Sequence, residues 1–288
     1  MQPRFDWALE PLADMSPAEF HDWQALLEER SGMVVSEQRR SFLQTNLSAR
    51  MREVGASDYA SYYRQVTSGP RGAVEWSTLM DRLTVQETRF FRHPASFDLL
   101  DSHLRHLVEL RAVQRPLALW SVGCASGEET YSLAMATAEA LAGREPDCGF
   151  GVTGTDISLS ALAKSRAGIY GARKLEQVEP SLRERYFLPL PDDRFQIIPG
   201  LAARVCFARL NVLELASSPV AGMDVIFCQN LLIYFRRWRR REILNRLADC
   251  LAPGGLLVIG VGEVVGWQHP ELRPVANDQV LAFTRISI

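Results

Sequence analysis

Three polar segments of the sequence follow apolar runs and contain residues that could bind a small molecule. The first is a small-residue turn from Gly123 to Gly127, which follows the apolar run 116–122 and leads into Glu128 and Glu129. Glycine lets the backbone turn tightly and approach a ligand, and a helix that begins there directs its free N–H groups to the same place. Two carboxylates at that position would repel a phosphate, so the turn favours a cation or a ligand rich in hydroxyl and amine groups.

The second segment ends in Asp156, which follows the next strand-like run. A carboxylate one strand–helix–strand unit after a glycine turn commonly holds a ribose diol. S-adenosylmethionine has a ribose diol, an amine and a sulfonium but no phosphate, so it fits these two segments better than NAD or ATP. Two simpler interpretations stay open: Ser126 and Glu129 have the spacing of a capping box, and Asp156 could only cap the helix after it.

The composition is typical of a soluble protein of enzyme size. The chain has 288 residues, 47% of them hydrophobic, and a net charge of −2, so it can bury a full core and has no global attraction to nucleic acid. No apolar run approaches the roughly 18 residues that cross a bilayer, and the acidic N-terminal region is unlike a signal peptide. We expect a cytoplasmic protein without membrane insertion.

Neither a structural metal nor a disulfide is expected. His103 and His106 could share a helix face, but no third ligand lies nearby in the sequence. The cysteines form no C-x-x-C pair and lie mostly in apolar runs, as reduced core thiols do; they are Cys124, Cys148, Cys206, Cys228 and Cys250.

The character of the pattern changes at about residue 90. Residues 1–90 show helical periods, including a capping sequence at 16–19, and are expected to form an all-helical domain. A helix over about 36–54 places apolar residues on one stripe and basic residues elsewhere, namely Arg39, Arg40, Arg50 and Arg52. A charged face is usually only solvated; the alternative is a docking surface for an acidic helical partner.

Strands and helices alternate after residue 115, which predicts a mainly parallel sheet covered on both faces. We expect strands near 117–122, 150–156, 204–208, 223–228, 255–261 and 279–285. Ligands of such sheets bind at the carboxyl ends of the strands, where Gly123, Asp156 and the third polar segment, around Asn230, would lie. The span 168–212 is too long for a simple connection and could contain a small inserted hairpin.

Several motifs, taken together and in order, resemble the CheR family of bacterial chemotaxis methyltransferases. They are Glu87–Arg92, Gly123–Ser132, Thr155–Ile157, Ala167–Tyr170, Phe227–Phe235 and Leu251–Gly255. The resemblance implies an α/β fold: a Rossmann-like class I methyltransferase domain over 91–288, a small all-helical N-terminal domain over 1–90, and a β-subdomain inserted at about 170–205.

The resemblance also implies the site residues. The cofactor-binding positions would be Gln86, Thr88, Arg92, Gly123, Glu128, Glu129, Asp156, Asn211, Val212, Gln229 and Asn230, with Tyr234 and Arg92 as the catalytic residues. Phe90 and Phe91 are expected to be buried between the two halves of the chain. The sequence departs from the family pattern at Gln229, where the family has arginine, and at Arg236, where it has an acid; the arginines of 236–241 are expected to alter surface contacts only.

The function that the resemblance implies is S-adenosylmethionine-dependent O-methylation of glutamate side chains on methyl-accepting chemoreceptors. The products would be glutamate methyl esters and S-adenosylhomocysteine, and the role would be chemosensory adaptation in signal transduction. A glutamate is already ionised at neutral pH, so no general base is needed and Tyr234 and Arg92 would only orient the reactants. Two alternatives stay open: a methyltransferase of this fold acting on a small molecule, and a non-catalytic protein that binds the cofactor. Nucleic acid is not an expected partner.

Overall fold

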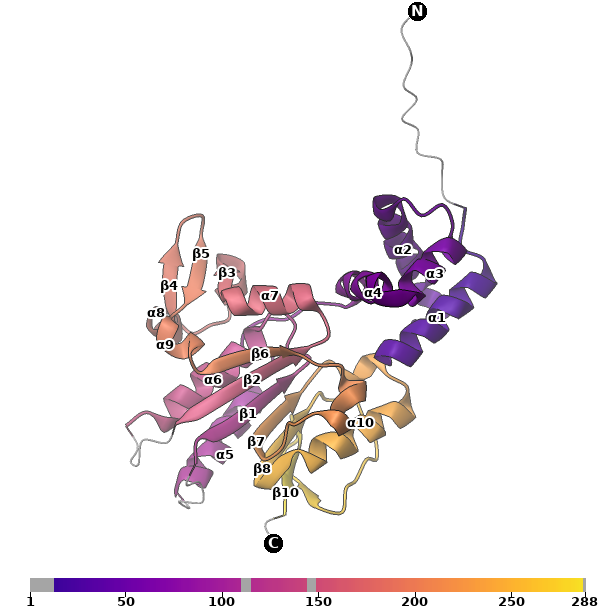
Figure 1. Ribbon diagram of the computed structural model, residues 1–288. Helices are drawn as coiled ribbons and strands as arrows, with labels where there is room; N and C mark the ends of the chain where they lie inside the picture. The colour runs from indigo at the N-terminus through magenta and orange to yellow at the C-terminus, as the bar shows by residue number, and fades with distance from the viewer. Residues whose placement is uncertain (1–12, 110–114, 144–148, 287–288) are drawn as a thin grey trace, which may run out of the picture. The chain divides into compact units, whose positions relative to one another are not determined.

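The computed structural model describes residues 13–109, 115–143 and 149–286, and the chain divides into two compact units between Thr84 and Val85. The first unit is helical (Figure 1). Its elements are α1 (Pro17–Ser31), η1 (Glu37–Arg39), α2 (Arg40–Val54), α3 (Tyr59–Thr67) and α4 (Gly69–Leu83). The helix expected over 36–54 therefore begins with a short 3-10 turn.

Caps and buried apolar side chains account for the helices of the first unit. The capping box at the start of α1 is present: the Glu19 amide donates to the Ser16 hydroxyl, and the Glu19 carboxylate accepts from the Ser16 amide. Gly32, with φ of 75°, ends α1 in the left-handed conformation that glycine favours. Trp23, Tyr62 and other side chains of this unit are almost completely buried and form its core, so amphipathic helices pack against one another.

The second unit is built on a seven-stranded sheet of order β6-β2-β1-β7-β8-β10-β9 (Figure 1). Its strands are β1 (Leu117–Val122), β2 (Phe150–Asp156), β6 (Val205–Arg209), β7 (Met223–Cys228), β8 (Leu251–Ile259), β9 (Leu272–Pro274) and β10 (Leu281–Arg285). The first five strands pair in parallel, and β10 runs antiparallel to β8 and β9. The expected mainly parallel sheet is confirmed; the short edge strand β9 was not expected.

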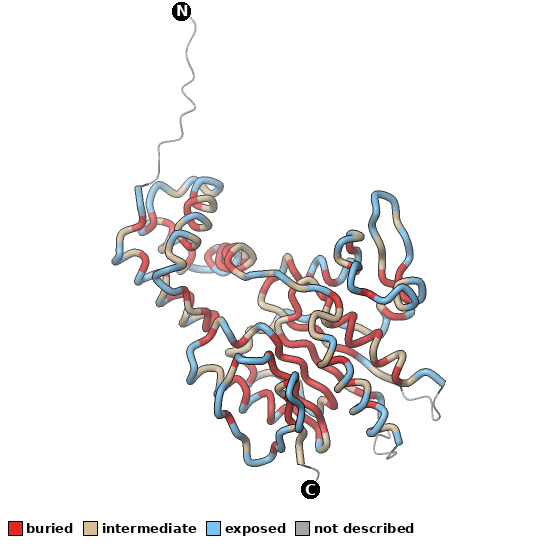
Figure 2. The backbone as a smooth tube through the Cα atoms, turned by 180° about the vertical axis from the view of Figure 1, so that it is seen from behind, coloured by how far each residue is buried: buried red, intermediate tan, exposed pale blue. Residues whose placement is uncertain are grey.

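Helices bury both faces of this sheet, and Figure 2 shows its central strands as a buried layer. On one face α5 (Pro94–Glu109) and α6 (Glu128–Leu141) share a core with β1, β2 and β7. On the other face α10 (Arg237–Asp249) packs against the opposite sides of the central strands. α7 (Leu159–Ala167) lies against β2 and β6 and contacts α6, whose Tyr131 hydroxyl donates to the Ser165 carbonyl at 3.0 Å. Burial on both faces explains why these strands are nearly continuous apolar runs.

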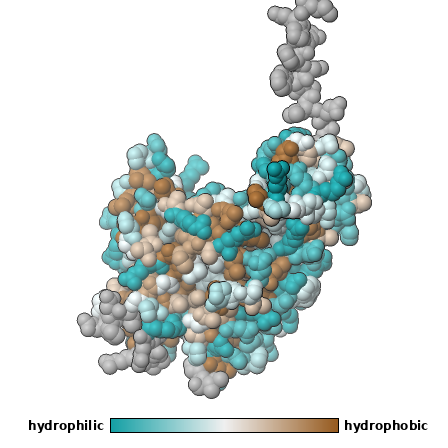
Figure 3. Space-filling view, in the orientation of Figure 1, coloured by the Kyte–Doolittle hydropathy of each residue, from teal (hydrophilic) through white to brown (hydrophobic). Residues whose placement is uncertain are grey.

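A small β-subdomain is inserted between α7 and β6. It contains a three-stranded antiparallel sheet of order β3-β5-β4, with β3 (Ile169–Gly171), β4 (Phe187–Leu190) and β5 (Arg194–Ile197). Short helices complete it: η2 (Ala172–Leu175), α8 (Pro180–Tyr186) and α9 (Pro199–Ala202). Hydrophobic side chains reach its surface (Figure 3), and Leu188 of β4 is among them.

The Phe90–Phe91 pair lies within the second unit, which corrects the expectation that it clamps the two halves of the chain together. Phe90 is fully buried. Its ring packs edge-on against the rings of Tyr170 and Phe187, both in the β-subdomain, with ring centres 4.9 and 5.4 Å apart. The ring of Phe91 packs against that of Phe97 in α5, with the ring centres 4.9 Å apart. The pair therefore fixes the β-subdomain and α5 to the segment that precedes them.

We predict that Phe90→Ala destabilises the second unit. Truncating a buried phenylalanine typically costs about 3–5 kcal/mol through lost burial and the cavity that remains. Thermal or denaturant unfolding of the full chain measures this effect. The control is Leu188→Ala, which removes an exposed side chain from the β-subdomain and should cost little. Equal losses in both variants would contradict the role of Phe90 in fixing the β-subdomain to the segment that precedes it.

Candidate functional site

The candidate site lies where the strand order reverses. β1 and β7 are neighbours in the sheet, and β2 and β8 flank them on either side. The chain leaves β1 toward one side and β7 toward the other, so the loops at their carboxyl ends separate and leave space for a ligand. Gly123 and Asn230 follow β1 and β7, and Asp156 is the last residue of β2, as the sequence indicated.

The loop after β1 uses its own N–H groups and leaves few for a phosphate. The amides of Gly123 and Cys124 donate to the Thr155 carbonyl at 2.8 and 2.9 Å, and the Gly127 amide donates to the Cys124 carbonyl at 2.9 Å. The Ala125 amide donates to the Asp156 carboxylate, also at 2.9 Å. Because a dinucleotide-binding loop needs such groups free for the pyrophosphate, this loop does not fit NAD.

Asp156 holds the backbone on both sides of its strand end. One carboxylate oxygen accepts from Ala125, and the other accepts from the Ser158 amide at 2.8 Å. The cap of α7 is Ser158, whose hydroxyl accepts from the Ala161 amide at 3.1 Å. The interpretation of Asp156 as a simple helix cap is therefore wrong, and the partly exposed carboxylate remains at the carboxyl edge of the sheet.

Glu128 and Glu129 face different surroundings. Glu128 is fully buried, lies 2.9 Å from the ammonium of Lys174 in the β-subdomain, and accepts from the Ser126 hydroxyl at 2.7 Å. Glu129 accepts from the hydroxyl of Ser121, in β1, at 2.7 Å. These bonds also show that the capping-box interpretation of Ser126 and Glu129 is wrong. Glu128 therefore joins the loop to the β-subdomain, whereas Glu129 is directed to the strand ends.

Charges from three elements meet around Glu129. Burial raises the pKa of Glu129 to about 7, and the neighbouring charge of Glu263 adds to the rise. The bond from Ser121 and the positive charge of Arg92 lower this pKa. A positively charged ligand group at this position would relieve the repulsion between the carboxylates.

The segment that contains Arg92 is tied to the same edge of the sheet. The Gln86 amide donates to the hydroxyls of Ser158 at 3.1 Å and Ser160 at 3.3 Å. The Thr88 carbonyl accepts from the Lys174 ammonium at 2.6 Å, and the Arg92 guanidinium donates to the Glu87 carbonyl at 3.0 Å. The structure thus brings Gln86, Thr88 and Arg92 to the strand ends.

The remaining expected cofactor-binding positions follow β6 and β7. Asn211 caps η3 (Val212–Ser217) through its side-chain oxygen, which accepts from Leu213 at 3.1 Å, and Val212 packs against the neighbouring core. Gln229 is buried and donates to the hydroxyl of Ser96 in α5 at 3.0 Å. The amide at the position of the family's arginine is thus engaged by α5, whereas the exposed Asn230 stays at the edge.

Sequence reasoning missed Glu263, which organises the loop containing Tyr234. Its buried carboxylate accepts amide hydrogens from Asn230 at 3.0 Å, Gly260 at 3.0 Å and Ile233 at 3.3 Å. A Cβ at Gly260 would lie 2.2 Å from that carboxylate, so only glycine fits there. Asn230 has φ of 59°, a conformation that the bond to Glu263 helps to hold. Glu263 comes after the apolar run of β8, as Asp156 comes at the end of the apolar run of β2, and that signal could have identified it.

Arg240 also holds this loop, which corrects the expectation that the 236–241 arginines alter surface contacts only. Its guanidinium donates to the carbonyls of Phe235 at 2.8 Å, Glu263 at 2.7 Å and Ile233 at 3.4 Å. Tyr234 lies within η4 (Leu232–Tyr234), between the residues that Glu263 and Arg240 bind. The position of the tyrosine backbone is therefore fixed from two sides.

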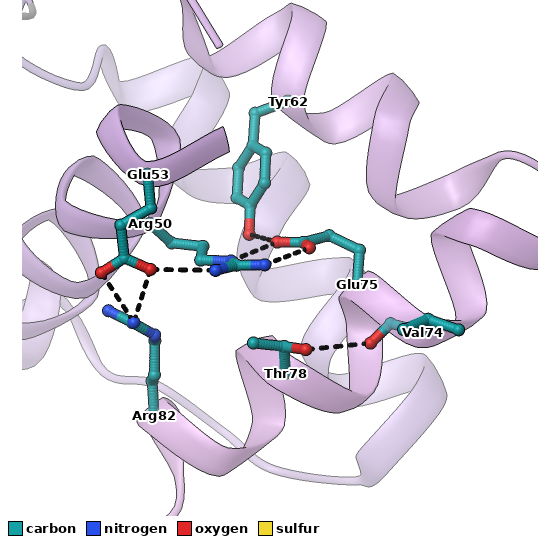
Figure 4. Close-up of polar contacts among 7 residues, drawn as sticks. All are labelled: Arg50, Glu53, Tyr62, Val74, Glu75, Thr78 and Arg82. Atoms are coloured by element: carbon teal, nitrogen blue, oxygen red, sulfur yellow. Dashed lines mark hydrogen bonds and ion pairs between the residues drawn. The ribbon is translucent and has the colours of Figure 1, made fainter. Parts of the chain in front are cut away.

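Two of the four arginines proposed for docking are engaged inside the first unit. The Arg50 guanidinium pairs with Glu75 at 2.7 Å and with Glu53 at 2.9 Å, and Tyr62 donates to the same Glu75 (Figure 4). The bond from Arg50 lowers the pKa of Glu75 despite burial. Arg40 donates to the Met15 carbonyl and stacks over Phe20, so it is also held. Arg39 lies over Phe42, and Arg52 is exposed.

The remaining expectations concern metals, thiols and membranes. The described residues contain no group of three or more side chains that could hold a metal ion, and none of their helices is long and apolar enough to cross a membrane. Cys124, Cys228 and Cys250 are buried free thiols, whereas Cys206 is exposed. Cys148 lies outside the described residues.

The charged side chains at the strand ends fit S-adenosylmethionine. The carboxylates of Glu129, Asp156 and Glu263 favour a ligand with positive charge and hydroxyl donors, and the Arg92 guanidinium could balance a carboxylate of that ligand. In the loop after β1, the amides of Gly123, Cys124, Ala125 and Gly127 are already bonded within the protein, so few are left for a phosphate. The bound cofactor would supply the sulfonium methyl group, and the residues around it would bind and orient it.

Comparison with known families agrees with this geometry. The family model described as "CheR methyltransferase, SAM binding domain" matches residues 86–281, and the model described as "CheR methyltransferase, all-alpha domain" matches residues 18–84. The chain therefore belongs to the CheR methyltransferase family, and its second unit is a methyltransferase domain that binds S-adenosylmethionine. The resemblance and the fold class inferred from the sequence are confirmed.

Several relatives are similar over most of the chain. A chemotaxis protein methyltransferase of Klebsiella aerogenes is 34% identical over 254 residues, covering 86% of this chain and 84% of that protein. One from Escherichia coli is 32% identical over 270 residues, covering 93% and 91%. A probable biofilm formation methyltransferase, WspC of Pseudomonas putida, is 35% identical over 260 residues, covering 90% of this chain and 60% of that protein.

We predict that ligand affinity depends on the protonation of Glu129. Its raised pKa means that the carboxyl group loses its proton only as the pH rises through about 7, and only the ionised form attracts an ammonium group. Affinity for S-adenosylhomocysteine should therefore rise between about pH 5.5 and 7.5, by no more than tenfold per pH unit from this one proton. Calorimetry of wild type and Glu129→Gln over this range tests the prediction. The variant should show a flat profile; a parallel rise in both proteins would assign the dependence elsewhere.

We also predict that Glu263→Gln lowers kcat while cofactor affinity persists. Glutamine keeps one acceptor oxygen but turns an NH₂ group toward backbone donors, so the loop of Asn230 and Tyr234 should lose its fixed position. Methyl-transfer kinetics, calorimetry and thermal unfolding separate these effects. The matched control is Glu271→Gln, which removes an exposed charge that pairs with Arg285. A kcat like that of the wild type would show that Glu263 does not position the reaction site.

Proposed function

We propose that the protein transfers the methyl group of S-adenosylmethionine to glutamate side chains of methyl-accepting chemoreceptors. The reaction would form a methyl ester and S-adenosylhomocysteine and would adjust chemosensory signalling. The site geometry, with its carboxylates at the strand ends and Arg92 beside Glu129, supports binding of the cofactor. The relatives named as chemotaxis protein methyltransferases support the chemosensory substrate.

The chemistry requires orientation more than proton transfer. A substrate glutamate is ionised at neutral pH and can attack the sulfonium methyl directly, so the site needs no general base. The attacking carboxylate and the sulfonium neutralise each other as the methyl moves, and a site with little water favours that change. We assign Arg92 and Tyr234 the role of orienting the reactants, since both belong to segments that are held at the strand ends.

Transfer of base-labile methyl groups tests the proposal. The protein is incubated with methyl-labelled S-adenosylmethionine and membranes that contain chemoreceptors of the same organism, and the methanol released by base is counted. We expect label in the receptor, because glutamate methyl esters are base-labile whereas N-methyl groups are not. Base-stable label, label only in a small molecule, or cofactor binding without transfer would contradict the proposal.

The same assay also tests the role of Arg92. Loss of a charge-assisted hydrogen bond costs about 1.5–3 kcal/mol, so Arg92→Ala should lower kcat/KM by about tenfold or more. Its melting temperature should stay near that of the wild type, because the side chain is only partly buried and its guanidinium donates to the Glu87 carbonyl, a neighbour in the same segment. Arg89→Ala, which removes an exposed arginine from the same segment, is the matched control. Equal activity of the two variants would remove Arg92 from the site.

A further inference from the structure

A basic and apolar surface beside Tyr234 has no role in the site described above. Four of the nine exposed large hydrophobic side chains in the described part of the chain lie here: Ile233 at 51% exposure, Trp238 at 55%, Val261 at 63% and Val265 at 72%. We call these four side chains the apolar rim. Solvent exposure of several large apolar side chains at one place indicates an interaction surface rather than a core.

Hydrogen bonds join the three segments that carry the rim. Arg240, at the start of α10, binds the carbonyls of Ile233 and Glu263, and Arg241 binds the carbonyls of Val265 at 3.4 Å and Gly266 at 3.3 Å. Ile233 and Glu263 are themselves bonded through the buried carboxylate at 3.3 Å. The rim is therefore held as a unit, and it includes Ile233, the residue that precedes Tyr234.

Positive charge surrounds the rim. Arg236, Arg237 and Arg241 are exposed, and the guanidinium of Arg239 lies 4.2 Å from the centre of the Trp238 ring while it pairs with Glu242. The first turn of α10 contains no acidic residue. Arginines at a helix N-terminus oppose the helix dipole, so this charge does not serve the stability of α10. It suits an acidic partner.

We propose that the apolar rim and its arginines form the docking surface for the chemoreceptor helix that carries the methyl-accepting glutamates. This inference rests on the proposed function. A substrate helix with acidic residues at helical spacing would place carboxylates against the arginines and apolar side chains against Trp238 and the valines. Tryptophan and arginine are the residues that most often dominate such contacts.

The location favours this surface over α2 as the place of direct contact. Ile233 and Tyr234 are consecutive residues of η4, so a helix on the rim brings its glutamate to the reaction site. Arg40 and Arg50 of α2 are engaged within the first unit, which leaves Arg39 and Arg52 to attract the substrate at longer range. A nucleic acid is a poorer match, because exposed valines offer nothing to phosphates and the rim has only one ring for stacking.

Receptor-dependent kinetics test the inference. The variants are Trp238→Ala, the pair Val261→Ser with Val265→Ser, and Arg237→Glu; none of these residues belongs to the cofactor site. The matched controls are Arg246→Glu, an exposed arginine in the last turn of the same helix, and Val74→Ser, an exposed valine of α4. Initial rates of base-labile methyl transfer are measured against the concentration of receptor-containing membranes, with calorimetry of S-adenosylhomocysteine alongside.

We expect KM for the receptor to rise about tenfold in the Trp238 and double-valine variants, with kcat and cofactor affinity unchanged. In Arg237→Glu the rise in KM should shrink as salt screens the charge. The controls should behave as wild type. Wild-type KM in all three variants, or an equal rise in the controls, would overturn the inference.

Three further outcomes are distinguishable. If the wild type transfers no base-labile methyl to receptors, the proposed function fails and the docking inference fails with it. If the wild type methylates receptors but the rim variants keep its KM, only the docking inference fails. Binding of labelled single-stranded DNA or RNA that Arg237→Glu abolishes, together with unchanged receptor KM, would identify a nucleic-acid surface and also overturn the inference.

Discussion

The site depends on buried or half-buried carboxylates that accept backbone N–H groups from neighbouring loops. Asp156, at the end of β2, binds Ala125 in the loop that follows β1, and Glu263, after β8, binds Asn230 in the loop that follows β7. β1 and β7 are adjacent, and β2 and β8 lie outside them. On each side of the strand reversal, an acid from the outer strand thus fixes the loop of the inner strand, and the two loops define the ligand site.

This arrangement has an electrostatic consequence. Burial away from water raises the pKa of Glu129 and of Glu263, and the neighbouring charge of Glu263 adds to the rise at Glu129. The backbone bonds to Glu263 lower its pKa, but burial outweighs them. A cationic ligand relieves the repulsion, whereas a phosphate would increase it. The same feature that stabilises the loops therefore selects the kind of cofactor, and Arg92 supplies an opposing charge that acts on Glu129.

Much of the fold could be predicted because buried parallel strands are plain apolar runs. The bounds of β1, β2 and β7 match the expected ranges, and Asp156 was recognisable because an acid follows a strand. Other features depend on residues distant in the sequence. Glu128 and Glu129 are adjacent on a helix and diverge in direction, and only Lys174, in the β-subdomain, shows which one is turned from the site. The ion pair that removes Arg50 from the surface joins residues 25 positions apart.

Glu263 could have been found, since it follows the apolar run of β8 as Asp156 follows that of β2, but the intervening turn conceals the parallel. The selection against phosphate was inferred from the charges of Glu128 and Glu129. The structure adds a stronger reason, which the sequence could not reveal: the amides of the loop after β1 are bonded to Thr155, Cys124 and Asp156.

The most direct test of the account is the affinity of Asp156→Ala for S-adenosylmethionine, measured by calorimetry beside the wild type. The account predicts a loss of at least about tenfold, since charge-assisted hydrogen bonds contribute about 1.5–3 kcal/mol each, with the folded state retained in thermal unfolding. An affinity equal to that of the wild type in a folded variant would contradict the claim that the carboxyl edge of this sheet binds the cofactor.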